Sequence, residues 1–209
     1  MSSTGAVGIA GYSQGGHAAA WAAQIAAEWA PGLEIAGVLA GAPASEVPEF
    51  VTIDSSDERP LLRALAVIVA SGLAATGDEF DLDTVLSDAG LDVLDQLEDS
   101  CEPDLVPGEP LTRADMTTLE PWASALSANV PGATPGTAPV LIVHSRTDSV
   151  VPIEHGRALA RRLCDAGGTV EMRELPEGEH APSGVPAYQQ GLAWIMDLMH
   201  GATPVSTCS

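Results

Sequence analysis

Residues 6–16 read AVGIAGYSQGG, a short apolar run that passes directly into a Gly-x-Ser-x-Gly turn. An apolar run without polar alternation is typical of a strand buried on both faces of a parallel sheet. Residues 14–29 are rich in alanine and free of proline, and Pro31 would end a helix there. Residues 34–40 form a second apolar run. Strand, tight turn, helix and strand make a βαβ unit, so the sequence predicts the α/β class.

The glycines around Ser13 have a steric purpose at such a turn. The backbone of a serine at a sharp strand-to-helix turn is strained, so Gly11 and Gly15 remove side chains that would collide there, and Gly16 relieves further crowding. The turn lifts the Ser13 hydroxyl clear of the sheet, and the backbone amide of Gln14 lies at the positive end of the helix. We therefore predict that Ser13 is a nucleophile and that Gln14 donates one hydrogen bond to an oxyanion.

The alternation of strand and helix is interrupted between residues 44 and 135. A polar, proline-containing stretch leads into the apolar segment Leu61–Ala75, which is shorter than a membrane span of ~20 residues. Asp83 or Thr84 would cap a further helix that runs through Leu97. These features predict a mostly helical insertion at 44–135.

The strand and helix pattern resumes after this insertion. We expect strands at 140–144 and 170–175 and helices at 153–166 and 186–200. Residues 1–209 are therefore predicted to form one α/β domain, in which a mostly parallel sheet is flanked by helices.

The charge balance of the chain is strongly acidic. It contains 29 Asp and Glu residues against 8 basic residues, all of them Arg, for a net charge of −21. Such a surface repels nucleic acids and anionic membranes, so we expect neither a nucleic-acid partner nor stable membrane insertion. Residues 1–4 carry no charged segment before the first apolar run, so no signal peptide is expected in this chain.

A serine nucleophile needs a histidine base, and His180 has the position expected for it. A carboxylate must orient that base, and in this type of fold the order along the chain is serine, acid, histidine. His180 ends the loop sequence PEGEH after the last expected strand. The other four histidines have different expected places: packing or substrate contact for His17, a position beside the acid for His144, the protein surface for His155, and a position past the last helix for His200.

The acid is expected in the turn after the preceding strand. Residues 144–152 read HSRTDSVVP and supply Asp148 there, between the serine and the histidine in the chain. Weaker candidates are Asp165, Glu177 and Glu179, of which the last two read as solvated loop charges. We therefore predict Asp148 as the acid of the triad.

Neither a metal site nor a cofactor is expected. The acidic residues Asp78, Glu79, Asp81 and Asp83 lack the spacing and the glycine of an EF-hand loop, which favours a solvated turn over a calcium site. The sequence contains no zinc, phosphate-loop or dinucleotide-binding pattern.

The chain has three cysteines, Cys101, Cys164 and Cys208, so at least one thiol is free or pairs outside the chain. One disulfide involving Cys101 would suit a secreted protein, and three reduced thiols would suit the cytosol equally well. The sequence leaves both alternatives open.

Four parts of the chain together resemble the secretory lipase family of actinobacteria and fungi. They are residues 11–19 around the serine, the acidic residues 80–83 followed by a helix to Cys101, residues 139–148, and residues 157–164 before 178–180. The resemblance covers almost the whole chain and implies an α/β-hydrolase fold. It also implies that Ser13, Asp148 and His180 are the catalytic triad, that the insertion contributes to a lid over an acyl pocket, and that the protein is extracellular.

Members of this family carry a long region before the elbow, with early strands of the sheet and a loop that donates the second oxyanion hydrogen bond. The elbow of this chain begins at Gly11. The resemblance therefore implies that the chain is the C-terminal portion of such a lipase, and that the other strands belong to a missing or separately encoded N-terminal segment. The elbow strand would then present an exposed apolar edge.

The expected reaction is transfer of the acyl group of a lipid ester, such as a triacylglycerol, to water, with contact to a lipid interface. Two alternatives remain: another serine hydrolase on this fold (acyltransferase, peptidase or cutinase-like esterase), and a catalytically incomplete fragment or half of a split lipase. Cutinases share the sequence GYSQG, but their acid and histidine follow the serine more closely, so the long insertion before Asp148 argues against them.

Overall fold

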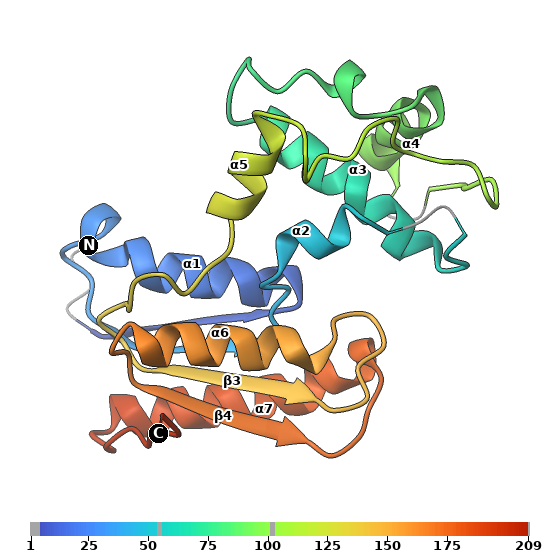
Figure 1. Ribbon diagram of the computed structural model, residues 1–209. Coiled ribbons are helices and arrows are strands. Elements are labelled where there is room, and N and C mark those ends of the chain that lie inside the picture. The colour runs from blue at the N-terminus through green and yellow to red at the C-terminus, as the bar shows by residue number, and fades with distance from the viewer. Residues whose placement is uncertain (1–4, 54–55, 101–102, 209) are drawn as a thin grey trace. The chain divides into compact units, whose positions relative to one another are not determined.

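The computed structural model describes residues 5–53, 56–100 and 103–208 (Figure 1). The chain divides into two compact units. The sheet unit comprises the residues up to Ser45 together with those from Pro131 onward, and the helical unit comprises residues 46–130. The helical unit lies within the range 44–135 that the sequence marks as an insertion.

The sheet unit contains four parallel strands in the order β1-β2-β3-β4. Their bounds are Val7–Tyr12, Ile35–Gly41, Val140–Ser145 and Val170–Leu175. In the register of the sheet, Tyr12 pairs with Gly41, Gly41 with Val143, and Ser145 with Leu175. The carboxyl ends of the strands therefore lie along one edge of the sheet, and the predicted α/β class is confirmed.

Helices cover both faces of this sheet (Figure 1). One face packs against α1 (Gln14–Trp29) and α6 (Ile153–Asp165), and the other packs against α7 (His180–Met199). Side chains alternate between the two faces along β2, where Val38 and Ala40 face α1 and Leu39 faces α7. Burial on both faces explains why these strands read as continuous apolar runs.

The sequence placed the start of the last helix six residues too late. The structure begins α7 at His180, and its backbone bonding starts where the Ser183 N–H donates to the Glu179 carbonyl at 3.1 Å. Proline suits the first turn of a helix, and the predicted start at 186 places Pro186 there. In the structure it lies inside the helix, at the cost of one backbone hydrogen bond.

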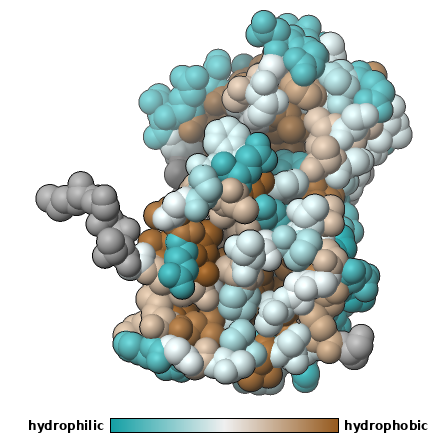
Figure 2. Space-filling view, turned by 90° about the vertical axis from the view of Figure 1, so that its left-hand side faces the viewer, coloured by the Kyte–Doolittle hydropathy of each residue, from teal (hydrophilic) through white to brown (hydrophobic). Residues whose placement is uncertain are grey.

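The outer face of α7 carries a stripe of exposed apolar side chains at helical spacing: Val185, Tyr188, Leu192, Met196 and Met199. Figure 2 shows hydrophobic patches on the face of the protein that it displays. None of the helices in the described part of the chain is long and apolar enough to cross a membrane.

The helical unit has its own apolar core. Its regular elements are α2 (Val47–Phe50), α3 (Pro60–Ala74), the 3-10 turn η1 (Leu82–Thr84), α4 (Asp88–Asp99) and α5 (Trp122–Ala128). The largest side chains fully buried in that core are Leu86, Met116, Trp122 and Leu126.

Helix α4 begins later than the sequence indicates. The backbone of residues 85–87 pairs with residues 111–113, through Arg113 N–H to the Val85 carbonyl at 2.8 Å and Ser87 N–H to the Leu111 carbonyl at 3.0 Å. Because this pairing takes the backbone groups that a helix would need, the helix starts only at Asp88, and its cap is Ser87 rather than Asp83 or Thr84.

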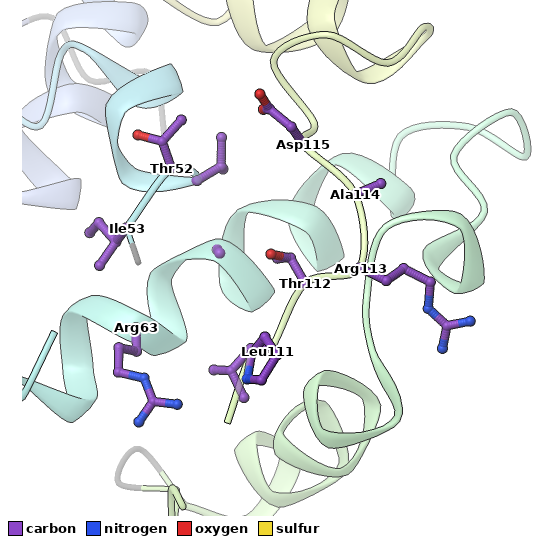
Figure 3. Close-up of a pocket in the computed structure, with 11 residues that line it drawn as sticks. Thr52, Ile53, Arg63, Leu111, Thr112, Arg113, Ala114 and Asp115 are labelled. Carbon is purple, nitrogen blue, oxygen red and sulfur yellow. The ribbon is translucent and has the colours of Figure 1, made fainter. Parts of the chain in front are cut away.

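The helical unit also holds a cavity of about 390 Å³, lined by residues 51–53, Arg63, Ala66 and residues 110–115. Figure 3 shows the guanidinium groups of Arg63 and Arg113 pointing away from each other. Each is engaged with backbone carbonyls, Arg63 with those of Val106 and Glu109 and Arg113 with that of Leu86. Both guanidinium groups therefore link separate segments of the helical unit through their hydrogen bonds.

A disulfide joins Cys164, in the last turn of α6, to Cys208 near the C-terminus. The C-terminal segment runs beside β4, where the Thr207 N–H donates to the Val170 carbonyl at 2.7 Å. This contact brings Cys208 to α6. The expectation that a disulfide would involve Cys101 is therefore wrong, and Cys101 itself lies outside the described residues.

Candidate active site

The three predicted triad residues follow three different strands of one sheet. Ser13 comes directly after β1, Asp148 lies in the turn after β3, and His180 follows β4. Because the strands are parallel and in register, all three segments leave the sheet at the same carboxyl edge. In open parallel sheets this edge is where ligands bind.

The elbow has the strained backbone that its sequence predicts. Ser13 has φ 58° and ψ −121°, an unusual conformation for a residue with a side chain, and its N–H donates to the Gly41 carbonyl at 2.9 Å. A Cβ at Gly11 would overlap the Gly15 carbonyl, and a Cβ at Gly16 would lie 2.5 Å from the Gly41 carbonyl oxygen. A Cβ at Gly15 would meet open space. The steric demand therefore falls on Gly11 and Gly16, and the prediction for Gly15 is wrong.

Asp148 and His180 form a direct acid–base pair. Asp148 Oδ2 lies 2.7 Å from His180 Nδ1, and Asp148 Oδ1 accepts hydrogen bonds from the N–H groups of Val150 at 3.0 Å and Val151 at 2.9 Å. The Asp148 side chain has no solvent exposure. Burial alone would raise the pKa of Asp148, but the hydrogen bonds from His180 and the two N–H groups outweigh it and hold the pKa below its ordinary value. An ionised carboxylate can only accept, so Nδ1 of His180 carries the proton of this hydrogen bond.

His180 is held by helix geometry as well as by its acid. It is the first residue of α7, whereas the sequence indicated a loop. The Tyr12 hydroxyl donates to the His180 carbonyl at 2.7 Å, and the two rings have centroids 5.2 Å apart. Burial, with a further effect from the Asp148 carboxylate, raises the pKa of Tyr12, so the phenol keeps the proton that it donates.

The role of Tyr12 could not be assigned from the sequence, because it belongs to the Gly-x-Ser-x-Gly motif only as a variable position. Its partner His180 is 168 residues away in the chain. The Tyr12 ring lies against two glycines, since a Cβ at Gly41 would approach its Cδ2 to 2.6 Å and a Cβ at Gly184 would lie 3.6 Å from its Cδ1. A glycine at the end of β2 and one in the first turns of α7 are the sequence signal for that close approach.

Of the four remaining histidines, His144 and His155 are buried, and His17 and His200 lie outside the Asp148–His180 pair and its surroundings. His144 is the next-to-last residue of β3 and lies beside the acid, as the sequence predicts, with Nε2 3.6 Å from Asp148 Oδ2. His155 is buried, with 1% exposure, so its predicted surface position is wrong. Its turn of α6 packs against β3 and the segment after β2, where the Ser45 hydroxyl donates to the His155 carbonyl at 2.8 Å. His17 lies in the elbow helix, and His200 follows the last residue of α7, as expected.

The weaker acid candidates lie at the surface. Asp165, Glu177 and Glu179 are all exposed, as was expected for the last two, and Glu179 accepts a hydrogen bond from the Ser149 hydroxyl at 2.7 Å. Within the described residues, no cluster of three or more His, Cys, Asp or Glu side chains could hold a metal ion. In the acidic segment, the Asp81 carboxylate accepts from the Asp83 N–H and caps the 3-10 turn.

The positions of Ser13 and Gln14 follow from β1 and α1, the strand and the helix that they join, and not from a contact with Asp148 or His180. The Ser13 hydroxyl makes no hydrogen bond within the described part of the chain. Catalytic hydrogen bonds are often long or poorly aligned in the absence of substrate. Gln14 begins α1, so its backbone N–H is one of the first four that no carbonyl of the helix can accept. The edge thus carries the Asp148–His180 pair, the Ser13 hydroxyl and the N-terminus of α1.

A family model described as "Secretory lipase" matches residues 1–207. A Mycobacterium tuberculosis protein, whose name describes an inactive lipase, is 27% identical over 209 residues, covering 93% of this chain and 46% of that protein. A secreted triacylglycerol lipase of Malassezia globosa is 25% identical over 224 residues, covering 95% of this chain and 47% of that protein.

The fold matches that of a solved structure as well. The X-ray structure of Candida antarctica lipase A superimposes with a TM-score of 0.81 at 22% identity, over 97% of this chain and 50% of that chain. The α/β-hydrolase fold expected from the sequence is thereby confirmed. The chain spans about half the length of the relatives that it matches.

Proposed function

The chain belongs to the secretory lipase family, and we propose that Ser13, Asp148 and His180 are the catalytic triad of a carboxylic ester hydrolase. The observation that carries this proposal is the 2.7 Å contact between Asp148 Oδ2 and His180 Nδ1, at the sheet edge that also bears the strained serine turn. An ionised, buried acid bonded to an imidazole is the arrangement that prepares a base.

The reaction begins when His180 Nε2 takes the proton of the Ser13 hydroxyl as its oxygen attacks the ester carbonyl. Asp148 holds the imidazole in the required tautomer and stabilises the imidazolium that forms. The Gln14 N–H donates one hydrogen bond to the oxyanion, aided by the dipole of α1. His180 then gives the proton to the leaving alcohol. In the second half of the reaction, water attacks the acyl group while His180 takes its proton, and His180 returns that proton to the Ser13 oxygen as the acid product leaves.

Lipid esters are the proposed substrates, since a relative from Malassezia globosa is a secreted triacylglycerol lipase. On this proposal the protein acts outside the cell, the helical unit forms a lid over the acyl pocket, and the apolar stripe on α7 contacts the lipid interface. No cofactor takes part in the mechanism.

A second candidate is a catalytically incomplete portion of a lipase. In the described sheet β1 pairs only with β2, so its other edge leaves backbone groups without a strand partner. One relative is named an inactive lipase. Loss of one oxyanion donor lowers the rate about 10²–10³-fold, so hydrolysis would be very slow even with a correctly built acid–base pair.

Labelling of the folded chain with a fluorophosphonate probe separates the two candidates. We expect labelling of the wild type, none of Ser13→Ala, and full labelling of Ser127→Ala, a control at an exposed serine of α5. A folded wild type that is not labelled would favour the incomplete portion, and labelling that survives Ser13→Ala would refute the nucleophile. Hydrolysis of p-nitrophenyl esters of increasing chain length, compared with peptide substrates, then tests the substrate class.

A further inference from the structure

A second imidazole, that of His144, lies against the Asp148 carboxylate. The His144 side chain has no solvent exposure. Its Nε2 lies 2.9 Å from the Val151 carbonyl oxygen and 3.6 Å from Asp148 Oδ2. Val151 is also the residue whose N–H binds Asp148 Oδ1. The ring therefore contacts both the carboxylate and the end of the turn that fixes it.

The protonation of His144 follows from its partners. A carbonyl oxygen can only accept, so Nε2 carries the proton. Burial lowers the pKa of His144, the Val151 carbonyl and the Asp148 charge act in the opposite direction, and nearby His155 and His180 lower it further. The net direction is downward, so the ring is neutral and Nδ1 is a bare acceptor. Nδ1 is buried and has no hydrogen-bond partner within the described residues.

The space around Nδ1 is closed by a glycine. A Cβ at Gly156, in the first turn of α6, would lie only 2.6 Å from His144 Nδ1. The ring is thus held between the backbone of α6 and the acid turn. A buried polar atom without a partner costs free energy, so a plain apolar side chain would serve packing better at this position.

We propose that His144 is a positioning residue for the acid of the triad: its Nε2–H holds the Val151 carbonyl, and thereby the turn from Asp148 to Val151, so that Oδ2 stays directed at His180. The proposal rests on the assignment of Asp148 and His180 as acid and base. A charged side chain here would compete with His180 for the negative charge of Asp148. A neutral donor fixes the turn and leaves that charge to stabilise the His180 imidazolium.

The test compares His144→Leu, which removes the donor, with His144→Gln, whose amide nitrogen can again reach the Val151 carbonyl. Misplacement of a catalytic group by about 1 Å can cost about 100-fold in rate. We expect His144→Leu to lower kcat about 10- to 100-fold with KM changed less than about twofold, and His144→Gln to recover most of the loss. Val140→Ala, at the other end of β3, should lower stability without changing kcat per folded molecule.

A spectroscopic readout makes the test independent of turnover. A proton held between an imidazole nitrogen and a carboxylate resonates far downfield in the proton NMR spectrum. We expect this His180 resonance to move or broaden in His144→Leu and to stay in place in His144→Gln and Val140→Ala. Should His144→Leu not fold, Gly156→Ala displaces the same ring and is expected to move the resonance in the same way.

An unchanged resonance and unchanged kcat in folded His144→Leu or Gly156→Ala would overturn the proposal, as would a loss that His144→Gln does not recover. The proposed hydrolase function fails separately, when the folded wild type is not labelled at Ser13. The His180 resonance requires no substrate, so it still decides the role of His144 in that case.

Discussion

The sheet unit and the helical unit differ in what they bury besides apolar side chains. Among the described residues, the sheet unit buries six polar or titratable side chains: Ser45, His144, Ser145, Asp148, His155 and Ser183. All lie at or just beyond the carboxyl ends of its strands or in the first turns of the helices there. Among its own described residues, the helical unit buries one such side chain, Arg63, within an otherwise apolar core.

This difference indicates which buried groups are present for chemistry. Burying polar groups costs free energy unless they are bonded, so a concentration of them at one edge needs a reason other than stability. The guanidinium of Arg63 binds backbone carbonyls of its own unit, which is a structural use. Substitutions at the sheet edge should therefore change rate more than stability, and substitutions in the helical unit should do the reverse.

Asp148→Asn should give the largest effect on the rate of hydrolysis. A small effect would contradict the difference drawn between the buried polar groups of the two units. The amide would retain an oxygen for the N–H groups of Val150 and Val151 but would present its NH₂ to His180 Nδ1. The imidazole would then carry its proton on Nε2 and could not accept one from Ser13. We expect ester hydrolysis to fall about 10⁴-fold while the thermal midpoint stays nearly constant, as measured by kinetics and circular dichroism. Asp165→Asn, at an exposed carboxylate, is the control.

Cys208→Ser sharpens the comparison within the sheet unit, because the Cys164–Cys208 disulfide is not part of the carboxyl edge. It closes a long segment, with a sequence separation of 44, so its loss should lower the free energy of unfolding by about 2–4 kcal/mol. The rate per folded molecule should not change. Urea denaturation with and without reductant measures the first quantity, and the reductant should have no further effect on the variant. A fall in rate at constant folded fraction would contradict the separation of roles.

Arg63→Met tests the helical unit. The change leaves the carbonyls of Val106 and Glu109 without their donor, and we expect a loss of about 1–3 kcal/mol in unfolding free energy. Hydrolysis of a short soluble ester, per folded molecule, should be retained. Arg161→Met, at an exposed arginine of α6, should change neither quantity. A large loss of rate without a loss of stability would mean that Arg63 serves catalysis.

Local patterns in the sequence were sufficient for the elements that local physics determines. The helix predicted at 14–29 and the strand predicted at 170–175 have the bounds found for α1 and β4. Apolar periodicity and the proline after α1 define them without reference to the rest of the chain. The same holds for the placement of Asp148 and His180 after consecutive strands, which the structure brings together as a bonded pair.

The features that sequence reasoning missed depend on partners far away in the chain. Helix α4 starts late because residues 85–87 pair with residues 111–113, and the burial of His155 depends on its packing beside β3 and Ser45. The disulfide partner of Cys164 is decided by a C-terminal segment that runs along β4. No local pattern reports such contacts.

Tyr12→Phe is the most delicate test, because it removes one hydroxyl that joins the elbow to the base. The ring should stay between Gly41 and Gly184, while the His180 carbonyl loses its donor. We expect a loss of about 1 kcal/mol in unfolding free energy and a fall of about 3- to 10-fold in kcat, since the base becomes less well oriented.

Tyr188→Phe is the matched control for this change. Its ring lies 6.4 Å from that of Tyr12, but its hydroxyl makes no hydrogen bond within the described residues and the side chain is 38% exposed. Equal effects of the two substitutions on kcat would mean that aromatic packing, and not the hydroxyl, orients His180. A larger effect of Tyr12→Phe would extend the polar cluster at the sheet edge to the residue that precedes the nucleophile, because one hydrogen bond would then couple the elbow to its base.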